Sequence, residues 1–278
     1  MTGAGAELAS KAAALDARLA SLGSVLVAYS GGIDSAFLAV TAARVLGDRS
    51  LCITADSPSY PDHHRDLAIG TARAFDLHHE MVRTSEVDNP DYRANPANRC
   101  YYCKHELYSR LTAIARDRGF AVVVDGSNAD DRGDYRPGRQ AAREFGVVSP
   151  LDEAGLTKGD IRDLARLAGM ETWDEPASAC LSSRIPYHSE VTEEKLRTID
   201  AAERVLRDLG FRVCRVRHHD TIARLELGRE EMARAFEPEV AAAIDRGLRA
   251  LGYAHVTVDL RGYRLGSLNE ALKLRPIE

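Results

Sequence analysis

The chain has 278 residues, of which 45% are hydrophobic and 28% charged, and its formal net charge is -5 at pH 7. This composition is ordinary for a globular protein and excludes a disordered or fibrous chain, and the length allows two domains. The acidic balance argues against broad nucleic-acid binding, which needs clustered Lys and Arg, and favours a small-molecule substrate.

The N-terminal stretch has no long apolar core, because charged side chains recur through its helical period. We therefore expect neither a signal peptide nor a membrane span, and a cytoplasmic protein. In a reducing compartment, an odd count of five cysteines indicates metal or thiol chemistry for some of them and not a disulfide framework. Cys52 and Cys214 lie in apolar strand runs and are expected to be buried.

Apolar runs alternate with helical periodicity through the first two thirds of the chain. The predicted elements are a helix at 5–22, a strand at 24–29, a helix at 35–46, a strand at 51–55, a helix at 61–75, a strand at 77–82, a helix at 101–118 and strands at 120–125 and 147–151. This alternation predicts an α/β fold in which helices wind a parallel sheet. Such sheets bind ligands at the carboxyl ends of their strands, which places the loops SGGIDS and DGSNADD at the site.

The pattern changes after Pro186. A long helix is followed by the strands FRVCRVRHH and TIARLELG, by helices around 229–250 and by the strand HVTVDL. This pattern predicts a smaller α+β domain, so we expect domains at 1–187 and 188–278. The longest irregular connection spans 84–100, and long loops in compact domains are often functional.

The loop SGGIDS at 30–35 joins a strand end to a helix start. Unpaired backbone N–H groups and the helix dipole favour an anion there, glycine lets the backbone approach phosphate oxygens, and serine adds donors. The lysine and the spacing of a Walker A loop are absent. A phosphate-binding turn is therefore favoured over a plain turn with a capping serine.

The same string resembles the SGGxDS signature of the PP-loop ATP pyrophosphatases. The resemblance implies a PP-loop fold and an enzyme that cleaves ATP between its α and β phosphates, adenylates an oxygen and lets a nucleophile displace AMP. It also implies Mg²⁺ on the phosphate oxygens, with Asp34 and Asp131 as candidate ligands, although Asp130 and Asp131 fit a loop-ordering role equally well. The residues expected to bind the nucleotide are Ser30, Gly31, Gly32, Asp34, Ser35, Asp56, Ser57, Gly126 and Asp130.

Three longer strings narrow the family: NPANRCYYCK at 95–104, DGSNADDRGDYRPGRQAAREFGVVSPL at 125–151 and KGDIRDLARLAGMETWDEPASACLSSRIPY at 158–187. Together with SGGIDS they resemble the LarE family, ATP-dependent sulfur transferases that make the nickel-pincer cofactor of lactate racemase. The resemblance implies a pyridinium dicarboxylate mononucleotide as substrate, whose carboxylates are adenylated and converted to thiocarboxylates. His188 stands where the family leads us to expect glycine, which indicates a different local backbone there.

The resemblance offers two sources of sulfur. Cys180 matches the family's sulfur-bearing cysteine, which in one branch attacks the acyl adenylate, loses its own sulfur and becomes dehydroalanine. In a second branch three cysteines hold a [4Fe-4S] cluster, and Cys100, Cys103 and Cys180 match that set. From the residues alone, the C-x-x-C pair also fits a redox pair or a zinc site completed by His105 or His188.

Two strands of the second domain alternate polar and apolar side chains. If they pair with their apolar faces against the helices, their arginines and a glutamate form one polar face, with Asp259 from the last strand. Such a face suits the substrate's phosphate, as in the family's proposed phosphate site, and a salt-bridged surface sheet is the alternative. The candidate phosphate-binding residues are Arg184, Arg215, Arg217, Arg224 and Glu226.

Other functions stay open at this point. Two are PP-loop enzymes: an ammonia-dependent ligase similar to NAD synthase, in which Cys180 has no role, and a tRNA thiolase, against which the acidic balance weighs. A third is a non-catalytic nucleotide sensor that binds ATP without releasing pyrophosphate. The resemblance further implies a homo-oligomer. The expected partner is a small-molecule substrate, and the charge balance and the absence of a predicted span argue against nucleic acid and membrane.

Overall fold

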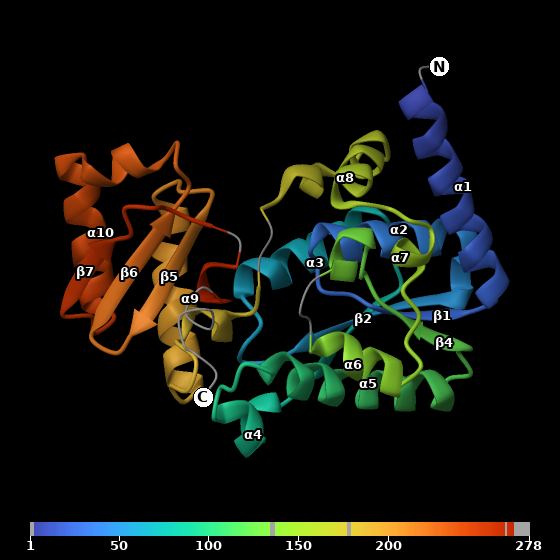
Figure 1. Ribbon diagram of the computed structural model, residues 1–278, viewed down its shortest axis with the longest axis horizontal. Coiled ribbons are helices and arrows are strands. Elements are labelled where there is room, and N and C mark those ends of the chain that lie inside the picture. The colour runs from blue at the N-terminus through green and yellow to red at the C-terminus, as the bar shows by residue number, and fades with distance from the viewer. Residues whose placement is uncertain (1–2, 134–136, 177–178, 265, 270–278) are drawn as a thin grey trace. The chain divides into compact units, whose positions relative to one another are not determined.

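The computed structural model describes residues 3–133, 137–176, 179–264 and 266–269 (Figure 1). The chain divides into two compact units. One comprises Met1–Glu86 and Asn98–Ser178, and the other comprises Val87–Ala97 and Ala179–Glu278. These units are defined by contacts within the chain, whereas the predicted boundary at residue 187 separates domains that fold independently. That boundary stays a prediction. No helix in the described ranges has the length and hydropathy needed to cross a bilayer.

The first unit is built on a parallel sheet of β1 (Val25–Ala28), β2 (Ser50–Asp56), β3 (His79–Arg83) and β4 (Val122–Val124), in the order β3-β2-β1-β4. Its helices are α1 (Gly3–Leu22), α2 (Ile33–Leu46), α3 (Asp62–Ala74), α5 (Arg99–Asp117), α6 (Gly138–Glu144), α7 (Pro150–Glu153) and α8 (Lys158–Leu167). The predicted α/β fold with a parallel sheet is confirmed.

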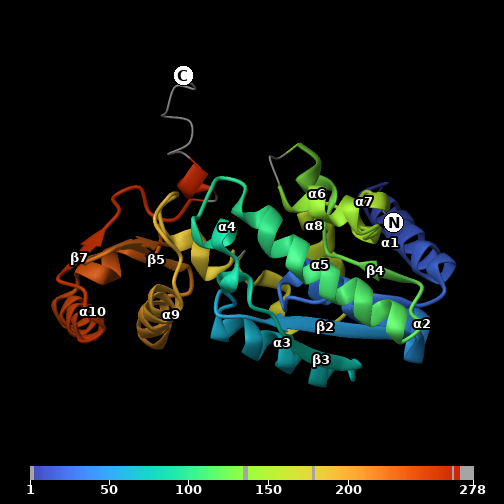
Figure 2. The same cartoon turned by 90° about the horizontal axis from the view of Figure 1, so that it is seen from below.

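Both faces of β1 are buried, because its successive residues enter different cores. Val25 and Val27 pack with residues of α1, α2 and α8, whereas Leu26 and Ala28 pack with residues of α5 and α6. Figure 1 shows these helix groups on opposite sides of the strands, and Figure 2 shows α5 running along its face. Burial on both faces explains the continuous apolar run of this strand.

The predicted strand at 147–151 is wrong beyond its second residue. Val148 forms an isolated parallel bridge with Val124, and Asp125 N donates to the Val148 carbonyl at 3.0 Å. Pro150 then begins α7, because its fixed φ suits a first helical position and it has no N–H to give to a sheet. The last full strand of the sheet is therefore β4.

The second unit contains α4 (Pro90–Arg93), α9 (Glu193–Asp208), β5 (Cys214–His219), β6 (Ile222–Leu227), α10 (Pro238–Ala250) and β7 (His255–Val258). β5 and β6 pair antiparallel, and β7 pairs parallel to β6. Their apolar faces pack with α9 and α10 in a core of its own. The predicted smaller α+β part is confirmed.

Within this unit His188 keeps the backbone conformation that glycine favours. Its φ is 68°, in the left-handed region, and its N–H donates to the Asn95 carbonyl at 3.0 Å. The histidine side chain therefore has not removed the left-handed turn, and the hydrogen bond offsets part of its cost.

Candidate functional site

The loop between β1 and α2 is shaped as an anion cradle. Gly32 caps α2 without any side-chain hydrogen bond, so the first N–H groups of this 14-residue helix are not covered by a capping side chain. Gly31 has φ 68°, and a Cβ there would lie 2.7 Å from the His64 carbonyl oxygen. Only glycine fits this close approach to α3, which holds the loop tight against the sheet.

Two serine hydroxyls close the same loop on itself. Ser35 Oγ donates to the Gly32 carbonyl at 3.0 Å and accepts from the Ser30 N–H at 3.1 Å, and the two hydroxyl oxygens lie 3.1 Å apart. Asp34 lies in the first helical turn. The sequence-predicted residues at 30–35 thus form one preorganised turn with a carboxylate at its rim.

Neighbouring loops form walls on either side of this turn. On the β4 side, a Cβ at Gly126 would lie 2.8 Å from Ser35 N, so this loop touches the turn backbone to backbone. On the β2 side, Tyr60 Oη lies 3.0 Å from the Ser30 carbonyl oxygen and 2.9 Å from that of His64, and its one hydrogen serves both contacts. The strand order is β3-β2-β1-β4, so the chain adds β2 and β3 on one side of β1 and then β4 on the other side. Parallel sheets bind ligands at such a switch point.

The DGSN loop after β4 is ordered by its own carboxylates. Asp130 Oδ2 accepts from the Lys158 N–H at 2.9 Å, and Asp131 Oδ2 accepts from the Asn128 N–H at 3.2 Å. Asp125 accepts from the Tyr108 and Ser149 hydroxyls, each at 2.7 Å. Of the two roles expected for Asp130 and Asp131, loop ordering is therefore visible, and Mg²⁺ coordination stays a prediction.

The loop after β2 carries the other predicted nucleotide contacts. Asp56 forms an ion pair with Arg65 at 2.5 Å, which engages its carboxylate within the unit. Ser57 is half-buried, and its hydroxyl lies 3.1 Å from that of Ser59. The Ser57 hydroxyl thus contacts another hydroxyl, whereas the Asp56 carboxylate is paired with an arginine.

The cysteines separate into buried and accessible groups, as expected. Cys52 and Cys214 are buried, and burial raises the pKa of each thiol to about 12. Cys100 is exposed and Cys103 half-buried in the first turns of α5, and Cys180 of the second unit is half-buried. High-pKa thiols are poor nucleophiles and ligands, which leaves Cys100, Cys103 and Cys180 as the candidate reactive thiols.

A metal-site geometry is not found among the described residues, where no three His, Cys, Asp or Glu side chains gather. The spacing of Cys100 and Cys103 nevertheless suits two ligands of one metal centre, because side chains three apart share a helix face. A cluster held by these two cysteines together with Cys180 stays a prediction, since Cys180 belongs to the other unit.

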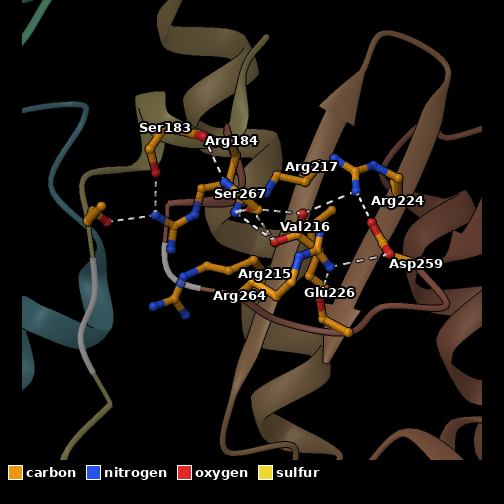
Figure 3. Close-up of polar contacts among 12 residues, drawn as sticks. Ser183, Arg184, Arg215, Val216, Arg217, Arg224, Glu226, Asp259, Arg264 and Ser267 are labelled. Atoms are coloured by element: carbon orange, nitrogen blue, oxygen red, sulfur yellow. Dashed lines mark hydrogen bonds and ion pairs between the residues drawn. The ribbon is translucent and has the colours of Figure 1, made fainter. Parts of the chain in front are cut away.

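In the second unit, the register of β5 and β6 creates the predicted polar face (Figure 3). Arg215 lies opposite Glu226, and Arg217 lies opposite Arg224. Arg217 donates to Glu226 at 2.7 Å and to the Ser183 carbonyl at 2.8 Å, and Arg224 pairs with both Glu226 and Asp259. The predicted pairing of these strands is confirmed.

Arg184 is a buried arginine close to this cluster. It is 1% exposed and forms a two-point ion pair with Glu203, at 2.8 and 2.9 Å, and it also donates to the Ala179 and Cys180 carbonyls. In this arrangement Arg184 fixes the loop that carries Cys180. Its predicted contact with a phosphate stays a prediction.

Glu203 is the residue that sequence reasoning missed. Burial would raise the pKa of Glu203, but attraction and hydrogen bonding from Arg184 outweigh it and lower the pKa to about 2. A signal was present, because Glu203 falls on the helical stripe of Leu196, Ile199 and Leu206, all buried. A carboxylate on an apolar stripe indicates a buried cationic partner.

Arg215 lies buried next to a second arginine of the cluster. Arg215 is 7% exposed, and its guanidinium lies 5.1 Å from the Tyr263 ring centroid. Burial, followed by repulsion from Arg184, lowers the pKa of Arg215 from its ordinary value. Crowded arginines gain when a phosphate neutralises them, because charge-assisted hydrogen bonds replace mutual repulsion.

Comparison with known proteins finds three relatives over most of the chain. No family model matches the chain. An uncharacterized protein of Synechocystis sp. (strain ATCC 27184 / PCC 6803 / Kazusa) is 44% identical over 247 residues, which cover 89% of this chain and 92% of the relative. An uncharacterized protein of Methanocaldococcus jannaschii is 28% identical over 240 residues, covering 86% and 90%.

A third relative carries a functional name. The pyridinium-3,5-bisthiocarboxylic acid mononucleotide synthase of Lactiplantibacillus plantarum is 38% identical to this chain over 270 residues, which cover 96% of each protein. An identity of this size over nearly the whole of both chains extends across the phosphate-loop unit and the arginine-bearing unit alike. The chain therefore belongs to the LarE family.

Proposed function

We propose that the protein is an ATP-dependent sulfur transferase that converts carboxylates of a pyridinium dicarboxylate mononucleotide into thiocarboxylates, in the biosynthesis of a nickel-pincer cofactor. The observation that carries the proposal is the cradle at 30–35, with the uncapped start of α2 and glycines at both close approaches. The printed activity of the Lactiplantibacillus relative supports it. The arginine face supplies a second anion site for the mononucleotide.

In the first half-reaction, a substrate carboxylate oxygen attacks the α-phosphorus of ATP, and pyrophosphate leaves with the electron pair of the broken P–O bond. The N–H groups at the start of α2 bind the pyrophosphate oxygens, and the hydroxyls of Ser30 and Ser35 rotate from their contacts within the loop to donate to the same oxygens. Asp34 at the rim of the turn is the proposed Mg²⁺ ligand, and its carboxylate oxygen suits that hard cation. Bound Mg²⁺ neutralises phosphate charge.

In the second half-reaction, sulfur attacks the acyl carbon and AMP leaves. Arg215 and Arg217 bind the phosphate of the mononucleotide, and Arg184 holds the backbone around Cys180. If Cys180 supplies the sulfur, its thiolate forms a thioester, a base removes Hα, and the Cβ–S bond breaks to leave dehydroalanine. If Cys100, Cys103 and Cys180 together hold a [4Fe-4S] cluster, that cluster supplies the sulfide when bound.

The test uses protein purified without oxygen, ATP, and the pyridinium dicarboxylate mononucleotide. We expect pyrophosphate and AMP to form together with a nucleotide in which sulfur replaces oxygen, and Asp34→Ala to abolish pyrophosphate release while the fold persists. Iron and sulfide that disappear in Cys100→Ala would assign the cluster route. Loss of the mass of one sulfur from Cys180 after reaction would assign the route in which Cys180 supplies the sulfur.

Two outcomes would contradict the proposal. AMP formation that depends on ammonia and gives no sulfur-containing product would indicate a ligase. ATP binding without any pyrophosphate release, in the presence of the mononucleotide and sulfide, would indicate a sensor.

A further inference from the structure

The long connection at 84–100 has no role in the mechanism above, although its length is typical of a functional loop. Its middle part, Val87–Ala97, belongs to the second unit, whereas the chain before and after it belongs to the first. This 87–97 segment is joined to the loop that follows Cys180, where the His188 N–H donates to the Asn95 carbonyl at 3.0 Å. The segment and the cysteine therefore share one unit.

The side chain of Asn95 binds the same loop through its amide. Asn95 is fully buried, and its φ of 54° is a left-handed conformation that asparagine tolerates. Its Nδ2 donates to the Pro186 carbonyl at 2.8 Å and to the Ser189 carbonyl at 3.0 Å, and the Ile185 carbonyl lies at 3.4 Å. These three carbonyls belong to residues outside any helix or strand. An amide side chain thus takes the place that a backbone ladder fills elsewhere.

A second contact of the 87–97 segment lies nearer to the cysteine. The hydroxyls of Tyr92 and Ser182 are hydrogen-bonded to each other, and both residues are fully buried. Ser182 lies in the short 3₁₀ turn Leu181–Arg184, and Cys180 occupies the N-cap position of that turn without a side-chain hydrogen bond to it. The segment therefore holds the chain after Cys180 at two places.

We propose that Asn95 is a positioning residue, which holds the Cys180 loop so that sulfur reaches the acyl carbon before water does. The inference rests on the proposed function, which it deepens. It applies whether Cys180 supplies the sulfur or binds the cluster, because both routes need the cysteine at a fixed distance from the reacting carbon. When the loop is released, the oxygen of water bonds to the acyl carbon instead and the bond to AMP breaks. AMP then leaves, and the carboxylate returns without sulfur.

The test measures AMP and thiocarboxylate in a single turnover of protein purified without oxygen, given ATP and the mononucleotide. Asn95→Gly keeps the left-handed backbone and removes the amide, and Asn95→Asp replaces the donor by an oxygen that faces the carbonyls. Both variants should raise the ratio of AMP to thiocarboxylate at least about tenfold over wild type, while the KM for ATP changes less than about twofold. A role limited to stability lowers the folded fraction and both products together, so it leaves the ratio unchanged.

Asn89→Asp is the matched control. Asn89 belongs to the same segment, but its side chain accepts from the Asp91 N–H at the start of α4, which a carboxylate oxygen does equally well. Its ratio should equal that of wild type. If neither Asn95 variant folds, Tyr92→Phe keeps the ring, loses only the hydroxyl, and should raise the ratio in their place.

A wild-type ratio in the Asn95 variants, or in Tyr92→Phe when those do not fold, would overturn this inference alone. An equal rise of the ratio in Asn89→Asp would overturn it too, because the effect would not depend on the amide of Asn95. A wild type that forms no thiocarboxylate at all would overturn the proposed function as well.

Discussion

Single buried charges hold the second unit together. The Glu203 carboxylate, 1% exposed, bonds to Arg184 in the loop after Cys180 and accepts from the Val216 N–H of β5 at 3.1 Å. One side chain of α9 thus ties a loop and a strand to its helix. Breaking such a pair leaves an uncompensated buried charge, which costs far more than removing an exposed ion pair.

The first prediction concerns pH. The folded-state pKa of Glu203, about 2, lies below its ordinary value of 4.5, so its stabilisation is complete above the unfolded pKa and is lost as pH falls toward 2. Between these values the free energy of unfolding should fall by about 1.4 kcal/mol more per pH unit in wild type than in Glu203→Gln. Urea unfolding across pH 2–5 measures the slopes. Equal slopes would contradict it, and Asp245→Asn, from an exposed pair with Arg249, is the control.

At the scale of elements, the sequence was informative where the pattern is local. Alternation within β5 and β6 was sufficient to predict that Arg215, Arg217 and Glu226 share a face, because side chains alternate with a period of two. The strand predicted at 147–151 is wrong from Pro150 onward, because proline has no N–H to donate to a sheet and begins a helix there despite the apolar run. The pair of Arg184 with Glu203 depends on tertiary packing, which no local pattern contains.

The second prediction concerns the contact between the β4 loop and the phosphate loop. Gly126→Ala places a methyl group 2.8 Å from Ser35 N, a backbone atom that cannot rotate away. We expect a loss of about 1–3 kcal/mol of stability and at least tenfold weaker ATP binding, as the turn at 30–35 shifts. Gly70→Ala in α3, where a Cβ meets nothing within 4 Å, should stabilise the helix and leave ATP binding unchanged. Thermal unfolding and ATP titration check both, and unchanged binding in Gly126→Ala would refute the expected role of this contact.

Across the whole molecule, each unit has its own core and its own candidate anion site. The phosphate turn depends on β1, α2 and the β4 loop of the first unit, and the arginine face depends on β5 and β6 of the second. The change of pattern after Pro186 predicts two domains, but it does not predict that Val87–Ala97 belongs to the second unit. It could not predict how the cysteines of the two units are combined, since that depends on the arrangement of the units and not on spacing.

The third prediction follows from this division. Arg215→Ala combined with Arg217→Ala should weaken binding of the mononucleotide by roughly 10- to 100-fold, because two charge-assisted donors are lost, while ATP binding changes less than twofold. Removing Arg217 leaves Glu226 with Arg224 and Ser267, so the fold should survive. If the double variant does not fold, the conservative Arg217→Lys keeps a positive charge at this position and can be measured instead. Arg249→Ala, an exposed arginine of the same unit, controls for net charge. Calorimetric titration of each ligand separates the two affinities, and equal losses for both would mean that the arginine face is not a separate phosphate site.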